Sequence, residues 1–220
     1  MERPIFFDSD MVQAILAGKK TVARRIARVP RRPGYTAQLS EVFADPGLGD
    51  GGYLQVPYLD SVDRLVHRVR CPYGSPGDRL WVRETWAPWS EHLDQTGEAE
   101  ALRVVKEQMP WAHIEYRADS SWSHHSVRRW RPAIHMPRWA SRITLEIISI
   151  RAERLHDITE EDAKREGVSP HSYPYCAESK RHREGFATLW DKVYCKRKHL
   201  ASWAPWSSNP FVWRIEFVVK

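Results

Sequence analysis

Cysteine is scarce in this sequence and long apolar runs are missing, and both features narrow the classes of protein to consider. The 220 residues include only three cysteines, Cys71, Cys176 and Cys195, with no Cys-x-x-Cys spacing. Neither a disulfide framework nor a standard zinc site is therefore expected. No apolar segment approaches the roughly 20 residues that a membrane-spanning helix needs. The charged residues Glu2 and Arg3 near the N-terminus are unlike a signal peptide. We expect a soluble, cytoplasmic protein with no metal, no cofactor and no membrane partner.

The common motifs of nucleotide-binding and hydrolytic enzymes are also missing. We find no glycine-rich phosphate loop, no metal-binding helix motif and no Ser-His-Asp signature. The chain has instead a net charge of +6 and eleven tryptophans. The charge favours acidic partners such as nucleic acid or nucleotides. Most of the indoles are expected to pack in the core, and one or two to stack on a base.

A basic segment that follows a short amphipathic helix is the most informative part of the sequence. Met11 and Ile15 share one helix face, which predicts a helix from about Ser9 to Ala17. Asp8 or Ser9 can cap its start, and Gly18 suits its C-terminal end. The helix is followed at once by Lys19, Lys20, Thr21, Arg24 and Arg25. Four positive charges within seven residues suit a phosphate or another polyanion, and a solvated basic turn is the alternative.

Two carboxylates stand at positions that favour a specific role. After a Pro-Gly-Asp turn at residues 76–78, Leu80, Val82 and Glu84 alternate on one strand face. A carboxylate on an apolar face is costly without a partner, so Glu84 is expected to be a general base or an ion-pair partner of Lys20 or Arg24. Glu166 ends a short acidic helix, where the helix dipole opposes its charge. It is expected either to serve a site or to be exposed.

The remaining pattern predicts an α+β fold in a single domain over residues 1–220. Alternating apolar residues predict strands over 142–150 and 211–219, and the spacing of apolar residues predicts a helix over about 179–194. About six strands with a few short helices favour a curved sheet or a small barrel. Segments near 28–52 and 88–131 are polar or rich in proline and glycine, and are expected to be insertions.

Five segments together resemble the ASCH domain family, a branch of the PUA-like β-barrels. They are residues 14–21 with Arg24-Arg25, residues 76–86, residues 134–142, residues 157–163 and residues 209–213. The length of the chain and its tryptophan-rich middle are similar to phage- and prophage-associated members. The resemblance implies a PUA-like β-barrel with short flanking helices and long loop insertions.

The resemblance also implies a function. ASCH domains are thought to bind RNA, nucleotides or modified nucleosides in a cleft lined by the Gly-x-Lys-Thr turn. A related bacterial branch deacetylates N4-acetylcytidine with a lysine, a threonine and a glutamate. The lysine corresponds to Lys20 and the glutamate to Glu166, whereas the threonine position is occupied by Ala23.

From these observations we expect a domain that binds single-stranded nucleic acid, RNA or a modified nucleoside through a basic cleft. The alternatives are a hydrolase in the same cleft, either an amidohydrolase or a ribonuclease, and a phage-associated interaction protein. The candidate catalytic residues are Lys20, Glu84 and Glu166. The candidate ligand-binding residues are Lys19, Thr21, Arg24, Arg25, Arg83, Arg138 and Trp139. Lys20, Thr21, Arg24, Glu84 and Glu166 are expected to line one cavity, with Arg83 and Trp139 near its rim.

Overall fold

The computed structural model describes most of the chain. The described residues are 1–28, 36–37, 43–45, 53–59, 64–88, 103, 114–119, 130–168, 181–194 and 204–220. Most of the predicted insertions near 28–52 and 88–131 lies outside these residues, as do Cys176 and Cys195. Cys71 is described and is buried.

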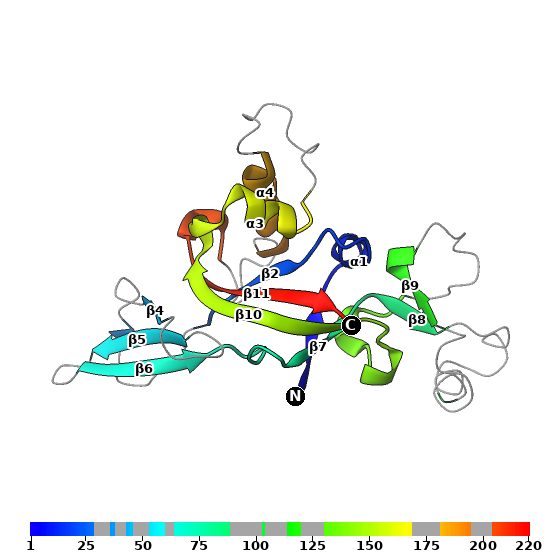
Figure 1. The fold of residues 1–220 in the computed structure, drawn as a ribbon, viewed down its shortest axis with the longest axis horizontal. Helices are drawn as coiled ribbons and strands as arrows, with labels where there is room; N and C mark the ends of the chain where they lie inside the picture. The colour runs from blue at the N-terminus through cyan, green and yellow to red at the C-terminus, as the bar shows by residue number, and fades with distance from the viewer. Residues whose placement is uncertain are drawn as a thin grey trace. The chain divides into compact units, whose positions relative to one another are not determined.

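A five-stranded mixed sheet is the main element of the fold (Figure 1). In spatial order its strands are β1 (Glu2–Phe6), β7 (Arg79–Arg83), β10 (Thr144–Arg154), β11 (Phe211–Val219) and β2 (Val22–Ile26). β1 runs parallel to β7, whereas β10 is antiparallel to β7 and β11 is antiparallel to β2. Within the described residues this order does not close on itself. The expected α+β class is confirmed, and the closed barrel stays a prediction.

Two smaller sheets accompany the main one. In one of them β5 (Tyr53–Leu59) pairs with β3 (Thr36–Ala37), β4 (Phe43–Asp45) and β6 (Arg64–Arg70). The other joins β8 (Trp86–Pro88) to β9 (Ile114–Tyr116).

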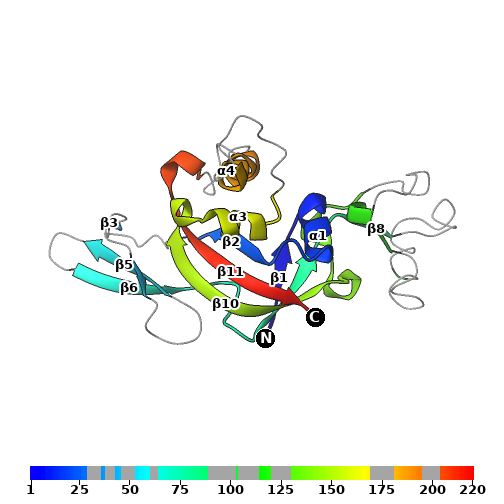
Figure 2. The same ribbon diagram turned by 45° about the horizontal axis from the view of Figure 1, so that its top comes forward.

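Three helices are described, and their ends follow ordinary capping rules. They are α1 (Ser9–Leu16), α3 (Glu160–Arg165) and α4 (Arg181–Tyr194). The Asp8 carboxylate accepts a hydrogen bond from the Met11 amide at 2.9 Å, and the Thr159 hydroxyl accepts one from the Asp162 amide at 3.0 Å. Gly18 and Gly167 follow α1 and α3 with φ of 68° and 80°, which glycine adopts without strain. In both views α3 lies beside α4 (Figures 1 and 2).

Single turns of 3-10 helix complete the described elements. They cover Arg117–Asp119, Ala133–His135, Arg138–Ala140, Leu155–Asp157 and Trp206–Ser208. None of the helices in the described residues is long and apolar enough to cross a membrane.

Strand positions test the predicted alternation directly. Leu80, Val82 and Glu84 are all buried, as expected for one inward face, and Trp81 on the opposite face of β7 is buried as well. Ile143, Leu145 and Ile147 are buried on the predicted strand, although β10 continues to Arg154. The sequence did not predict β1, which contains Pro4 and pairs through one edge only, or β2, which contains two arginines.

The chain divides into two compact units. Unit 1 comprises Met1–Gly18, Arg79–Glu146 and Val219–Lys220, and unit 2 comprises Lys19–Asp78 and Ile147–Val218. A core cluster of unit 1 contains Trp86, Ile114, Met136 and Ala140. A core cluster of unit 2 contains Leu155, Ile158, Ala163, Phe186, Trp190 and Val212. A single domain over residues 1–220 stays a prediction.

Candidate functional site

Lys20 and Glu166 form a buried ion pair in unit 2. Lys20 lies two residues before β2, and Glu166 is the C-cap of α3. An isolated antiparallel bridge joins the two residues, and the Thr21 amide donates to the Arg165 carbonyl at 2.9 Å. Lys20 Nζ lies 2.5 Å from Glu166 Oε2 and donates to the Glu166 carbonyl oxygen at 2.9 Å. The residues are 1% and 4% exposed, so the charges are held away from bulk water.

Arg24, on β2, joins this pair to two further carboxylates. Its Nη1 donates to Glu166 Oε1 at 3.3 Å and its Nη2 to Asp162 Oδ2 at 2.6 Å. Its Nε donates to Glu153 Oε1 at 2.8 Å. The Arg24 side chain is 0% exposed. The guanidinium therefore holds carboxylates from β10, from the first turn of α3 and from its C-cap at the same time.

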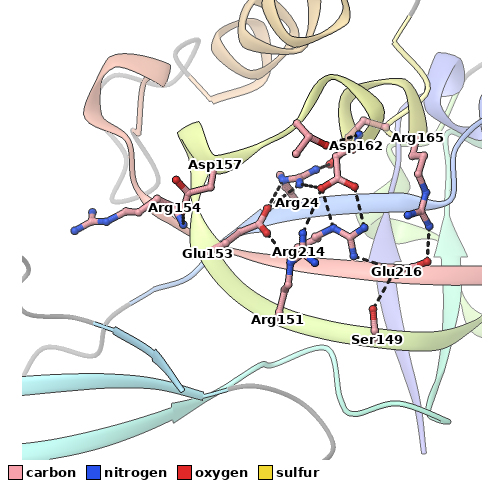
Figure 3. Close-up of polar contacts among 12 residues, drawn as sticks. Arg24, Ser149, Arg151, Glu153, Arg154, Asp157, Asp162, Arg165, Arg214 and Glu216 are labelled. Carbon is pink, nitrogen blue, oxygen red and sulfur yellow. Dashed lines mark hydrogen bonds and ion pairs between the residues drawn. The ribbon is translucent and has the colours of Figure 1, made fainter. Parts of the chain in front are cut away.

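The contacts continue across β10, β11 and α3 (Figure 3). Arg214 binds Asp162 at 2.8 Å and Glu216 at 3.0 Å, and Arg151 binds Glu153 at 2.7 Å. Arg165 binds Glu216 and donates to the Thr21 hydroxyl at 3.1 Å. We call this cluster the ionic network. Its five cations are Lys20, Arg24, Arg151, Arg165 and Arg214, and its four carboxylates are Glu153, Asp162, Glu166 and Glu216.

The cations of the network keep two of its carboxylates ionised. Burial acts to raise the pKa of Asp162, but hydrogen bonds from Arg214 and Arg24 outweigh it and lower the pKa to about 2. Burial opposes the same change at Glu216, where Arg165 and Arg214 lower the pKa to about 2. Both groups are therefore carboxylates at neutral pH.

Arg25 and two tyrosines extend the surroundings of Glu166. Arg25 is half-buried on β2, and burial acts to lower its pKa. Interactions with Tyr194, Tyr73 and Glu166 outweigh burial, so the pKa is raised. Tyr194 lies at the end of α4 with its ring 4.2 Å from that of Trp190. Sequence reasoning missed both tyrosines, because neither stands in a segment with a recognisable motif.

The basic cluster predicted from the sequence is only partly available to a ligand. Lys19 is exposed, Thr21 and Arg25 are half-buried, and the side chains of Lys20 and Arg24 are 0% exposed. The charges of Lys20 and Arg24 are compensated by carboxylates of the same unit. A polyanion at the surface of this unit would therefore meet Lys19 before it met either buried cation.

Glu84 belongs to unit 1, where it has a different partner. It is 1% exposed and accepts two hydrogen bonds from Arg142, at 2.9 and 3.1 Å. Arg142 also binds Asp119 at 2.5 Å and lies 3.9 Å from the centre of the Tyr116 ring. Burial raises the pKa of Glu84 by more than Arg142 lowers it. Burial likewise raises the pKa of Tyr116, to about 12.

Three predicted ligand-binding residues also belong to unit 1. Arg83 donates to the Met136 carbonyl at 2.9 Å and lies over the Trp81 ring at 4.8 Å. Arg138 is exposed and pairs with Glu2 at 2.9 Å. Trp139 is half-buried and meets Trp86 edge-on at 6.1 Å between ring centres. Lys20, Thr21, Arg24 and Glu166 all lie in unit 2, and the single cavity shared with Glu84 stays a prediction.

Sequence reasoning also missed most of the network carboxylates and their partners. A usable signal was present, because Arg151 and Glu153 share one face of β10, and Arg214 and Glu216 share one face of β11. Opposite charges two residues apart in otherwise apolar strands indicate a buried ionic cluster. Among the described residues no group of three or more His, Cys, Asp or Glu side chains is arranged to hold a metal ion.

Comparison with known proteins identifies no relative of this chain. No family model, no curated protein and no solved structure matches the chain.

Proposed function

We propose that this chain is an ASCH-like domain of PUA-like architecture that binds a modified nucleoside, a nucleotide or single-stranded RNA at the Lys20–Glu166 pair. The observation that carries the proposal is the 2.5 Å contact between Lys20 Nζ and Glu166 Oε2. These are the two residues to which the resemblance assigns the ligand chemistry, although 146 positions separate them in the sequence.

The pair suits recognition of a base by hydrogen bonding. An ammonium supplies three donors and a carboxylate supplies acceptors, so together they complement a ligand edge that carries both kinds of group. In a site shielded from water such contacts are stronger than at the surface. The exposed Lys19 is a cation that a phosphate can reach.

The proposal is tested by binding measurements on the purified chain. The probes are cytidine, N4-acetylcytidine and a short single-stranded RNA, measured by calorimetry. We expect Lys20→Ala to weaken the affinity of a bound probe by about 1–3 kcal/mol, the contribution of a hydrogen bond to a charged group. Lys164→Ala, at an exposed lysine of α3, is the control and should bind normally. Equal affinity of Lys20→Ala and the unmodified chain, or no binding of any probe, would contradict the proposal.

A second candidate function is amide hydrolysis at the same pair. The 2.5 Å separation allows a proton to pass between the lysine and the carboxylate, as acid–base catalysis requires. Release of acetate from N4-acetylcytidine, lost in Lys20→Ala, would favour this candidate over binding alone. Ala23→Thr would supply the hydroxyl of the deacetylating branch. Because Ala23 is 0% exposed, we expect that substitution to cost about 1–3 kcal/mol of stability.

A further inference from the structure

We propose that Arg24 is a positioning residue that fixes the Glu166 carboxylate relative to Lys20. The proposal rests on the proposed function in one respect, namely that the Lys20–Glu166 pair is where the ligand binds. It assigns to Arg24 a role within the protein in place of the direct ligand contact that the basic sequence cluster suggests.

Pairing each carboxylate of the network with one cation does not require Arg24. Each carboxylate that it touches already has another cation: Lys20 on Glu166, Arg214 on Asp162 and Arg151 on Glu153. Without Arg24 the network would contain four cations and four carboxylates. A guanidinium that is 0% exposed is therefore held where the balance of charge does not require it. Because an unnecessary buried charge is unfavourable, its retention calls for a geometric role.

The contacts of Arg24 supply that role. Lys20 holds one oxygen of Glu166, Oε2, and Arg24 holds the other, Oε1. One contact leaves the carboxylate free to rotate about its terminal bond, whereas two contacts from different directions fix its plane. Arg24 is in turn held by Asp162 and Glu153, at 2.6 and 2.8 Å. The planar, forked guanidinium can make these three contacts at once, and a lysine ammonium at this position could not reproduce their geometry.

The consequence concerns the direction in which Lys20 donates. Its ammonium already donates to the Glu166 carbonyl and to Oε2. If the carboxylate turns, the ammonium must follow it or lose a hydrogen bond in a buried site. A fixed carboxylate therefore fixes the lysine that we propose as the ligand contact.

The experiment uses the full chain labelled with ¹⁵N-lysine and compares four variants. A buried ammonium with two fixed acceptors exchanges its protons slowly, so Lys20 should give a side-chain NMR signal that disappears in Lys20→Arg. We expect Arg24→Gln and Arg24→Lys both to broaden or shift this signal. Arg151→Gln is the control within the same network. In the described part of the chain Arg151 binds Glu153 and Asp162, and it has no contact with Glu166 there. This variant should leave the signal in place.

The affinity of each variant for the nucleoside probes, cytidine and N4-acetylcytidine, gives a second measurement. We expect at least a tenfold loss in Arg24→Gln and in Arg24→Lys, and less than a threefold change in Arg151→Gln. If Arg24→Lys restores both the signal and the affinity, Arg24 acts through its charge alone and the proposal is wrong. The proposal is equally wrong if Arg24→Gln matches Arg151→Gln, or if the unmodified chain gives no Lys20 signal.

The two measurements separate this proposal from the proposed function. The NMR measurement needs no ligand, so it decides the role of Arg24 even if no probe binds. If the unmodified chain binds no probe but the NMR signals of the variants change as expected, only the proposed function is wrong. Should Arg24→Gln fail to fold, judged by circular dichroism, the same two measurements on Arg24→Lys decide the question.

Discussion

Each unit of the molecule contains a buried carboxylate, and the pKa values of the two groups are shifted in opposite directions. Glu84 in unit 1 is 1% exposed and its pKa is raised, with burial as the main cause. Asp162 in unit 2 is 6% exposed and its pKa is lowered to about 2. Burial therefore does not by itself determine whether such a group is charged.

The difference follows from the number of cations that each carboxylate meets. Glu84 has Arg142, and Arg142 also binds a second carboxylate, Asp119. Asp162 has Arg24 and Arg214 in direct contact and Arg151 at 3.4 Å. In unit 2 the buried charges hold one another in place, whereas in unit 1 one guanidinium serves two acids. Removing the charge of Asp162 should therefore destabilise the fold more than removing that of Glu84.

Asp162→Asn should have the largest effect on stability. The substitution leaves Arg24 and Arg214 buried without the carboxylate that joins them, and breaking a buried pair on one side typically costs about 3–5 kcal/mol. Urea denaturation at pH 7 measures the change in the free energy of unfolding. Glu161→Gln, at an exposed acid on the same helix, is the control and should change it by less than about 0.5 kcal/mol. A cost for Asp162→Asn below about 1 kcal/mol would mean that the network adapts and that the comparison fails.

The dependence of stability on pH should show the same contrast with a smaller effect. A carboxylate whose pKa is lower in the folded state stabilises the fold above its unfolded pKa, and this contribution is lost as the pH falls through the folded value. For Asp162 the window lies between 3.8 and about 2, and for Glu216 between 4.5 and about 2. The shift at Asp162 corresponds to about 2 kcal/mol.

Denaturation measured at steps from pH 5 to pH 2 tests this expectation. The unmodified chain should lose stability steadily across the window, and Asp162→Asn should lose about 2 kcal/mol less over the same range. Parallel curves for the two proteins would show that Asp162 does not titrate at a lowered pKa in the folded state.

Much of the fold could be predicted from local pattern, because capping and alternation act over a few residues. Asp8 caps the helix that the sequence predicts from about Ser9 to Ala17, and Ile143, Leu145 and Ile147 face inward as their alternation indicates. Strand β2 could not be found in this way. Two arginines at its centre indicate an exposed turn, and only partners more than 120 positions away make Arg24 a buried residue.

The candidate site divides along the same line. The family resemblance predicts that Lys20 and Glu166 line one cavity, but it does not predict their ion pair, and no local rule links residues 146 positions apart. From the sequence, Glu84 was predicted to need a cationic partner, with Lys20 and Arg24 as the candidates. In the structure its partner is Arg142 of unit 1. Local rules predict that a buried charge needs compensation, but tertiary structure decides which residue provides it.

Glu84→Gln should have the smallest effect, and its dependence on pH should be the reverse of that of Asp162→Asn. Because the folded pKa of Glu84 is raised above 4.5, its contribution to stability is present below that value and is lost as the pH rises through the folded pKa.

Glutamine resembles the uncharged form of Glu84 at every pH. We therefore expect a cost of about 1 kcal/mol at pH 4, the value of one ordinary hydrogen bond, and a smaller cost at pH 7. Glu161→Gln, at an exposed acid of unit 2, is again the control and should change the stability by less than about 0.5 kcal/mol at both values. A cost of Glu84→Gln that grows between pH 4 and pH 7 would show that unit 1 stabilises a charged Glu84. One guanidinium would then be sufficient for a buried carboxylate, and the number of cations would no longer explain the difference between the two units.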